Sequence, residues 1–238
     1  MRRKSILAVV VGVLLALLAD NSVSMGSLIN DGQPHIIDYT FGRFLRIRGD
    51  GTHVTVVDGG YIPLDILTHD NSCVVFTGGS VGRHFYAYDS SHVDFYGGSV
   101  NSRFFAKDHS RVNFFGGTIG FDFVGKDFSQ VNITGGVIGP QLYVEDMAQV
   151  SVSGGFIEQY ITANDTSTIT LYGSEFNYGY GQIPDSTGRL TGILASGETI
   201  DNTCYIRDNA RIILVPEPTT LLLLGLGGLP LLRKRRTL

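Results

Sequence analysis

The chain has 238 residues, of which 43% are hydrophobic and 17% charged, so its middle is unlike the weakly hydrophobic, highly charged sequence of a disordered tail. Glycine is abundant at 31 residues, but it follows no Gly-X-Y period, which excludes collagen. Glycine, β-branched and aromatic residues together, without any tryptophan, favour many short strands joined by tight turns.

Basic residues are concentrated at the two ends of the chain. Seven of the 18 lysines and arginines lie at positions 2–4 and 233–236, so residues 25–217 hold 11 basic against 21 acidic side chains. The net charge of this middle part is −10. Because phosphate backbones are bound by basic surfaces, we expect no nucleic-acid partner.

Residues 1–24 show the three parts of a secretory signal peptide. Arg2, Arg3 and Lys4 form the charged start, residues 6–19 form an apolar run, and Ser22-Val23-Ser24 is a cleavage site of the small-x-small type. The alternative is an N-terminal membrane anchor, but this run of 14 residues is short for a span that needs about 20. We therefore predict a signal helix that is removed on export.

The middle of the chain is a 19-residue repeat. Gly59-Gly60 precedes the regular series of glycine pairs, and Gly173-Ser174 follows it on the same interval. The regular pairs stand at 78–79, 97–98, 116–117, 135–136 and 154–155. Such self-similarity at a fixed period is the signature of a repeat architecture.

Aligned repeats give columns in which apolar and polar residues alternate with a period of two on both sides of the glycines. Two apolar columns precede the glycine pair: Val74, Val93, Val112, Val131, Val150, Ile169, and Phe76, Phe95, Phe114, Ile133, Val152, Leu171. Two more follow it: Val81, Val100, Ile119, Ile138, Ile157, Phe176, and Phe85, Phe104, Phe123, Leu142, Ile161, Tyr180. No helical period of 3.6 is present, so the repeat is built from strands.

These columns predict an all-β fold, a single parallel β-helix (β-solenoid) of about seven to eight 19-residue coils with two or three short strands each. Like residues would then stack about 4.8 Å apart and share a core that no single coil could bury. Hexapeptide repeats build left-handed coils of about 18 residues, so a coil of 19 favours the right hand. The alternative is a blade or sandwich in which each repeat is an antiparallel hairpin.

The same alignment divides the chain into segments. We predict an N-terminal cap at 25–49, the repeats at 50–182, an insertion that forms a loop or cap at 183–206, and a final repeat strand at 207–215. The caps are expected because the end of a strand stack otherwise offers an unpaired edge.

An aspartate column is the strongest polar feature of the repeat: Asp70, Asp89, Asp108, Asp127, Asp146 and Asp165. Carboxylates spaced by one coil could bind Ca²⁺, and Asp89, Asp108 and Asp127 are the candidates. The favoured alternative is an Asx-turn, in which each carboxylate accepts a hydrogen bond from the backbone two residues on. We therefore predict no metal or cofactor, with calcium as the one exception left open.

Outward aromatic residues form two further columns: Tyr86, Phe105, Tyr143, and Tyr96, Phe115, Tyr172. Such rings can stack on sugars or pack against a partner chain. The favoured alternative is that they stack on one another and stabilise neighbouring coils.

No catalytic constellation emerges from the sequence. The six histidines have no metal-ligand spacing. Asp65 and Asp122 share a column three coils apart, about 14 Å, which is too far for paired-carboxylate glycoside chemistry. Glu158 is the third acid considered as a candidate acid or base. We predict no catalytic residues, and the pairing of Cys73 with Cys204 is left open.

The segment 216–238 joins the tripeptide Pro216-Glu217-Pro218, an apolar stretch at 219–232, and the basic cluster Arg233, Lys234, Arg235 and Arg236. As a helix, the 14 apolar residues would reach only about 21 Å of a roughly 30 Å hydrocarbon core. By the positive-inside rule, the basic cluster stays in the cytoplasm and the preceding chain lies outside. The three features together resemble the PEP-CTERM sorting signal of biofilm-forming bacteria with a Gram-negative-type envelope.

That resemblance implies a C-terminal hydrophobic helix, transient recognition by an exosortase, cleavage near the Pro-Glu-Pro tripeptide and delivery from an inner-membrane intermediate to the envelope, outer surface or extracellular matrix. The alternative is an ordinary tail anchor. We expect a non-catalytic structural protein of the surface or biofilm matrix, associated with exopolysaccharide. Two alternatives are a polysaccharide-active lyase or hydrolase on a β-helix scaffold, by analogy of fold, and a self-assembling envelope protein.

Overall fold

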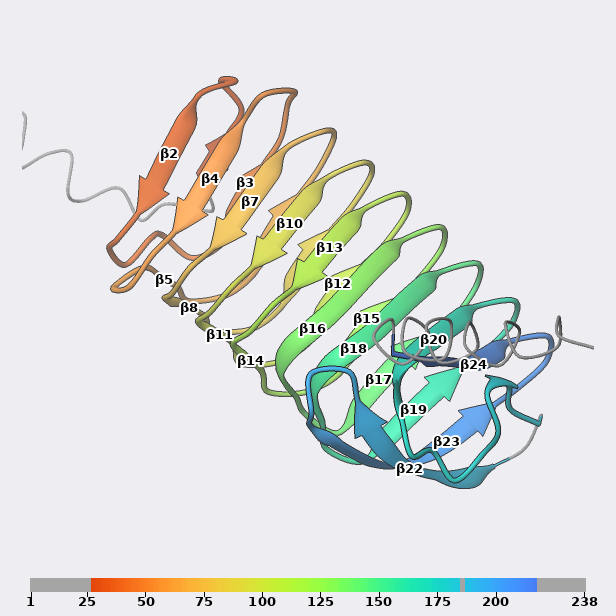
Figure 1. The fold of residues 1–238 in the computed structure, drawn as a ribbon. Helices are drawn as coiled ribbons and strands as arrows, with labels where there is room; N and C mark the ends of the chain where they lie inside the picture. Colours follow the sequence, from red (N-terminus) through yellow and green to blue (C-terminus); the bar gives the residue numbers. More distant parts are fainter. Residues whose placement is uncertain (1–26, 185–186, 218–238) are drawn as a thin grey trace, which may run out of the picture.

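The computed structural model describes residues 27–184 and 187–217, and all regular structure in these two ranges is β. The chain winds into a parallel β-solenoid of about eight turns whose coils lie side by side along one axis (Figure 1). The predicted all-β parallel solenoid is confirmed. The signal helix at 1–24 and the C-terminal helix lie outside the described residues, and within them no helix suited to crossing a membrane occurs.

Each coil contributes strands to three faces. Face 1 consists of β2 (Pro34–Ile37), β4 (His53–Val56), β7 (Cys73–Phe76), β10 (His92–Phe95), β13 (Arg111–Phe114), β16 (Gln130–Ile138), β18 (Gln149–Ile157), β20 (Thr168–Ser174) and β24 (Arg211–Pro216). Face 2 consists of β5 (Tyr61–Ile62), β8 (Ser80–Val81), β11 (Ser99–Val100) and β14 (Thr118–Ile119), continued by the ends of β16 and β18. Face 3 consists of β1 (Ser27–Ile29), β3 (Leu45–Ile47), β6 (Ile66–Thr68), β9 (Phe85–Ala87), β12 (Phe104–Ala106), β15 (Phe123–Gly125), β17 (Gln141–Val144), β19 (Tyr160–Ala163) and β23 (Thr199–Ile206).

Parallel pairing keeps the repeat in register. On face 1, Val93 pairs with Val74 on one side and Val112 on the other, and on face 3 Phe104 pairs with Phe85 and Phe123. Because each of these partners is 19 residues away, the residues of the regular coils lie beside their own column neighbours. The columns seen in the sequence are therefore physical rows along the rod.

The core consists of inward rows of valine, isoleucine and phenylalanine. Phe76, Phe95 and Phe114 stack along one row, with centroids 4.8 and 5.4 Å apart. A second row, Phe85, Phe104 and Phe123, stacks at 4.6 and 5.0 Å and meets the first row edge to face. All six rings are fully buried. Aromatic rings prefer both offset-stacked and edge-to-face contacts, so the two rows add geometric specificity to the burial of apolar area.

The second glycine of the regular pairs turns the chain from face 1 to face 2. Gly117 has φ of +88°, and a Cβ there would lie 2.7 Å from the carbonyl oxygen of Gly98 in the preceding coil. Left-handed backbone and close packing of successive turns both demand glycine at this position. This explains why the pairs recur without exception through the regular coils.

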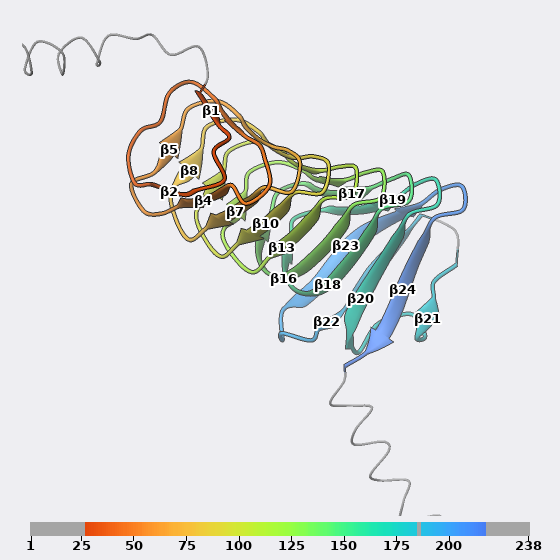
Figure 2. The ribbon, with the colours of Figure 1, turned by 90° about the horizontal axis from the view of Figure 1, so that it is seen from above.

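The repeat ends differently from the column alignment. Phe176 is only partly buried and Tyr180 is 53% exposed, so the expected core positions of these two residues are wrong. After β20 the chain leaves the stack and forms β21 (Gly181–Gln182), which pairs antiparallel with β24, and β22 (Gly188–Leu194), which pairs antiparallel with β20 and β23. The stack resumes with β23 on β19 and β24 on β20 (Figure 2).

The two cysteines are free thiols on different parts of the rod. Cys73 lies on β7 and is half-buried, whereas Cys204 lies on β23 and is buried. Burial raises the pKa of the Cys204 thiol to about 12. Cys73 and Cys204 therefore form no disulfide with each other in this structure.

A buried serine row gives a first prediction. Ser129 Oγ is buried without a hydrogen-bond partner, whereas Ser72 Oγ donates to the carbonyl oxygen of His69 at 2.7 Å. Ala148 already occupies the same row, fully buried. Because an unpartnered buried hydroxyl carries its desolvation cost, Ser129→Ala should stabilise the fold by about 1 kcal/mol, raising Tm by about 2–4 °C in calorimetry. Ser72→Ala, the matched control, should lower Tm, and equal shifts in both variants would contradict the argument.

The core itself gives a second prediction. Val112 is 1% exposed between Val93 and Val131, so Val112→Asp places an unpaired carboxylate in an apolar row. The variant should lose about 3 kcal/mol or more and its cooperative urea transition should collapse. Gln130→Asp, on the exposed side of the adjacent strand, should change stability by less than about 0.5 kcal/mol. Unfolding is followed by far-ultraviolet circular dichroism. If Val112→Asp still shows a cooperative urea transition like that of the wild type, Val112 is not a core residue.

Candidate functional site

The aspartate row forms the turns that lead from face 3 back to face 1. Asp70, Asp89, Asp108, Asp127, Asp146, Asp165 and Asp208 have φ between 53° and 60°. Such left-handed backbone is uncommon outside glycine, and Asp and Asn are among the residues that tolerate it best. The turn is closed by a backbone hydrogen bond, as from the N–H of Ser91 to the carbonyl of Tyr88 at 3.1 Å.

Each aspartate carboxylate ties its coil to the one before it. The N–H of Asp70 donates to Asp89 Oδ2 at 3.0 Å, and that of Asp89 donates to Asp108 Oδ2 at 2.9 Å. The series continues through Asp165, and Gly49 starts it by donating to Asp70 Oδ2 at 2.9 Å. The expected Asx-turn, with a donor two residues on, is therefore replaced by a hydrogen bond between coils. The local donor is used elsewhere, because the N–H of Ser91, two residues after Asp89, donates to the carbonyl of Tyr88.

Calcium at Asp89, Asp108 and Asp127 remains a prediction. One carboxylate oxygen of each residue already accepts a backbone hydrogen bond. In the two described ranges, no group of three or more His, Cys, Asp or Glu side chains is placed to share a metal ion. The geometry of these aspartates is accounted for by the fold.

The outward aromatic columns stack on themselves. Tyr96 and Phe115 follow β10 and β13 with ring centroids 4.6 Å apart, and Tyr86 on β9 stacks on Phe105 of β12 at 4.8 Å. Rings stacked in this way cover each other's faces and leave mainly their edges to solvent. Tyr172 lies on β20 beside Val215 of β24, away from the Tyr96 pair. A sugar can therefore stack only at the ends of such a ladder.

Tyr143 on β17 is held by polar contacts. Its hydroxyl donates to Glu145 at 2.9 Å and accepts from the amide of Asn164 at 2.7 Å. Glu145 also pairs with Lys126, which raises the pKa of that lysine. Burial and the hydrogen bond to Glu145 raise the pKa of Tyr143, so its phenol remains protonated at neutral pH.

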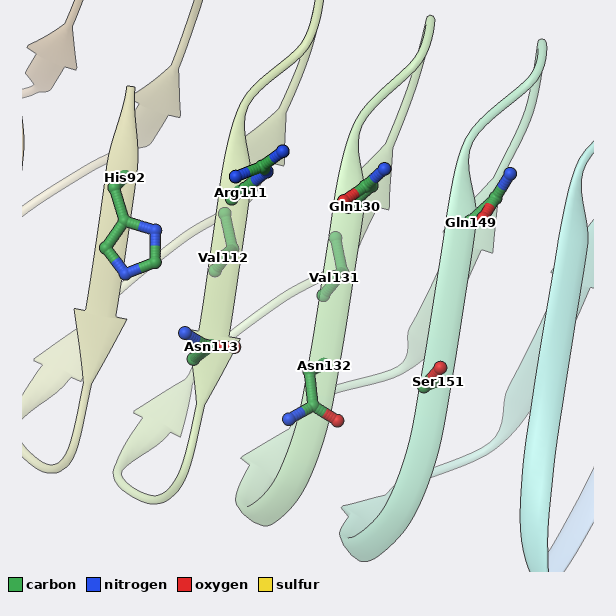
Figure 3. Close-up of a pocket in the computed structure, with 9 residues that line it drawn as sticks. All are labelled: His92, Arg111, Val112, Asn113, Gln130, Val131, Asn132, Gln149 and Ser151. Carbon is green, nitrogen blue, oxygen red and sulfur yellow. The ribbon is translucent and has the colours of Figure 1, made fainter. Parts of the chain in front are cut away.

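A shallow polar groove crosses β10, β13, β16 and β18 on face 1 (Figure 3). Its volume is about 330 Å³. One row along it consists of His92, Arg111, Gln130 and Gln149, and the other of Asn113, Asn132 and Ser151. Val112 and Val131 lie between the rows with their side chains in the core.

Some polar groups in this groove are paired within the protein, whereas others are exposed to solvent. Asn113 Nδ2 donates to Asp94 Oδ1 at 2.8 Å, and His92 Nε2 lies 3.1 Å from the same oxygen. Arg111, Gln130, Gln149 and Asn132 are exposed. The result is a flat, open row of amide and guanidinium groups that repeats once per coil, suited to an extended ligand with many hydroxyls.

Sequence reasoning missed this groove, although its signal was present. Gln130 and Gln149 share one column, and Asn113 and Asn132 share another. Repetition of an amide at an outward position has no role in the core, so it indicates a surface function. The acids Asp65, Asp122 and Glu158 were considered instead.

Sorting-motif residues lie only partly within the described chain. Pro216 is the last residue of β24 and pairs with Gly173, and Ser174 Oγ donates to Glu217 Oε1 at 3.3 Å. Pro218 and the basic cluster Arg233, Lys234, Arg235 and Arg236 lie outside the described residues.

Comparisons with family models, curated proteins and solved structures find no match to this chain. A proposed function therefore has to be argued from the geometry of the solenoid and from its sequence signals.

The aspartate turns give a pH prediction. The N–H of Asp70, and then His69, hold the pKa of Asp89 below its ordinary value of 3.8. A lowered folded-state pKa contributes stability that is complete above the ordinary value and is lost as pH falls through the folded-state pKa. Asp89→Asn should therefore be less stable than wild type at pH 7, and the difference should shrink as the pH falls below 3.8, the ordinary pKa of the carboxyl. Urea unfolding at pH 7 and pH 2.5 measures this, and an equal difference at both pH values would contradict it.

Proposed function

We propose that this chain is a non-catalytic, exported structural protein of the cell surface or biofilm matrix, and that the rod lies along exopolysaccharide through the groove on face 1. The coil is right-handed in this proposal, a hand supported by the order of near and far strands in Figure 1. The groove of amide and guanidinium groups is the observation that carries the proposal.

The groove fits a polysaccharide in shape and chemistry. Its groups repeat about every 4.8 Å, close to the length of one pyranose residue in an extended chain. Asn, Gln, Arg and His side chains supply donors and acceptors for vicinal hydroxyls without demanding a charged ligand. A shallow, open surface of this kind binds a chain along its length rather than enclosing a small substrate.

The acidic residues support a role without catalysis. Asp65 accepts from the N–H of His84 at 3.0 Å and pairs with Arg83, and Asp122 pairs with Arg103 at 2.8 Å. Paired-carboxylate chemistry needs one acid with a raised pKa beside an ionised partner, whereas each of these acids has a cation as its neighbour.

Export and sorting complete the proposal. Residues 1–24 direct secretion, and an exosortase recognises residues 216–238 in an inner-membrane intermediate before the rod reaches the envelope, outer surface or matrix. The support is the sequence resemblance together with the acidic composition of residues 25–217. A net negative rod stays soluble among acidic matrix polymers rather than collapsing on them.

A retention experiment tests the binding proposal. The full chain, solubilised in mild detergent, is passed over immobilised neutral and acidic exopolysaccharides with and without Ca²⁺, and new sugar ends are counted in the same tubes. Gln130→Ala combined with Asn132→Ala should weaken retention about thirtyfold, because two polar contacts of about 1 kcal/mol each are lost.

Asn101→Ala is the matched control, an exposed amide beyond β11 on face 2 that should leave retention unchanged. Retention that is insensitive to the double variant would refute the groove as the binding surface. New sugar ends would overturn the non-catalytic assignment, and retention that depends on Ca²⁺ would direct attention to Asp89, Asp108 and Asp127.

A further inference from the structure

An outward ring row on face 3 has one missing ring. The row runs Leu67, Tyr86, Phe105, Val124, Tyr143 and Thr162. Tyr86 and Phe105 are parallel within 3° at 4.8 Å, the spacing of one coil, so their faces look along the rod axis. One face of Phe105 is thus covered by Tyr86, and the other looks towards the coil that carries Val124.

A hollow of about 260 Å³ lies over this valine, lined by Arg103, Phe105, Asp122, Val124, Gln141 and Tyr143. Val124 is 7% exposed and forms the floor. Phe105 and Tyr143 are two coils apart, about 9.6 Å. A ring one coil beyond Phe105 would lie about 4.8 Å from it, the same spacing as in the Tyr86–Phe105 pair.

The rim of the hollow is polar, and its charges cancel. Arg103 Nε donates to Asp122 Oδ2 at 2.8 Å. Gln141 Nε2 donates to Thr162 Oγ1 at 2.7 Å, which leaves the amide oxygen of Gln141 as an acceptor. The guanidinium keeps further N–H donors, and the carboxylate keeps further lone pairs. The rim therefore offers donors and acceptors side by side with no net charge.

We propose that this hollow binds one neutral hexopyranose ring, a single residue of the polysaccharide. The ring's C–H face lies on Phe105, Val124 forms the floor, and vicinal hydroxyls bond to Arg103, Asp122 and Gln141. The volume is below the roughly 300–1,000 Å³ of pockets for drug-sized ligands, which limits the guest to one ring. The choice of a sugar rests on the proposed function, but the hollow is on a different face from the amide groove.

Two other guests are less suited to this chemistry. A uronate would bring a carboxylate against Asp122, and Arg103, the cation of the lining, is already paired. Lys107 lies outside the lining, with its ammonium over the rings of Tyr88 and Phe105. A planar aromatic molecule would stack between the walls but would leave the polar rim without partners, at the cost of desolvating it.

Filling the gap tests the proposal. Val124→Phe completes the ring row, so it should keep or raise the Tm while occupying the hollow. Leu67→Phe is the matched control, because it adds a ring beside Tyr86 at the other end of the row. Phe105→Leu removes one wall and serves as a second, independent variant.

The measurement is ligand-observed saturation-transfer NMR on the full chain with the methyl pyranosides of glucose, galactose and mannose, with glucuronic acid and indole as comparators. We expect at least one neutral pyranoside to bind with millimolar affinity, with at least tenfold weaker binding to Val124→Phe and Phe105→Leu and no change in Leu67→Phe. Unchanged binding in the folded Val124→Phe variant, or preferred binding of indole or glucuronic acid, would overturn the proposal.

Polysaccharide retention by the same preparations separates this proposal from the proposed function. Retention together with the absence of pyranoside binding refutes the hollow and leaves the face 1 groove standing. Pyranoside binding without retention supports the hollow and refutes the groove. The absence of both refutes the two proposals together.

Discussion

In-register stacking of a 19-residue coil is the constraint on which the rest of the structure depends. In the regular coils each strand residue lies beside the residue 19 positions away. A column must therefore contain side chains that can pack against similar side chains about 4.8 Å away. Phenylalanine and valine satisfy this by packing, and glycine does so by leaving room for the next turn. Aspartate does so because its carboxylate accepts a hydrogen bond from the backbone N–H of the preceding aspartate, which offsets part of the repulsion between neighbouring carboxylates and fixes the register.

The regular part of the fold was predictable because several repeats show the same type of residue at each inward position. Five or six repeats agree on each inward position, so the core rows and the parallel solenoid follow from sequence alone. The end of the stack did not follow, because Phe176 and Tyr180 continue the pattern by residue type while the antiparallel strands β21 and β22 take over the pairing. The strands of this antiparallel cap do not follow the 19-residue period, so the repeat does not predict them. The partner of each aspartate carboxylate was also mispredicted, since local and between-coil donors have the same sequence signature.

Uniform columns and binding sites make opposite demands on the same surface. Where rings occupy neighbouring coils, as Tyr96 and Phe115 do, they stack face to face and stabilise the rod, so their faces are not open to a ligand. The two binding surfaces that we propose lie where a ring row is interrupted, at Val124, and where exposed amides repeat, on face 1. Recurrence of one residue type in a column identifies the residues that hold the coils together. A break in a ring column and a repeated outward amide are both guides to a surface function.

The separation in sequence between stacked strands also sets how the rod assembles. Most pairings join residues 19 apart, about a tenth of the described chain, which is a contact order typical of fast-folding helical proteins rather than of β-sandwiches. The last two parallel pairings, β19 with β23 and β20 with β24, join residues 43 apart and enclose the antiparallel cap. The regular coils can therefore fold one after another. Pairing at the C-terminal end requires a longer loop to be closed, which has a larger entropic cost.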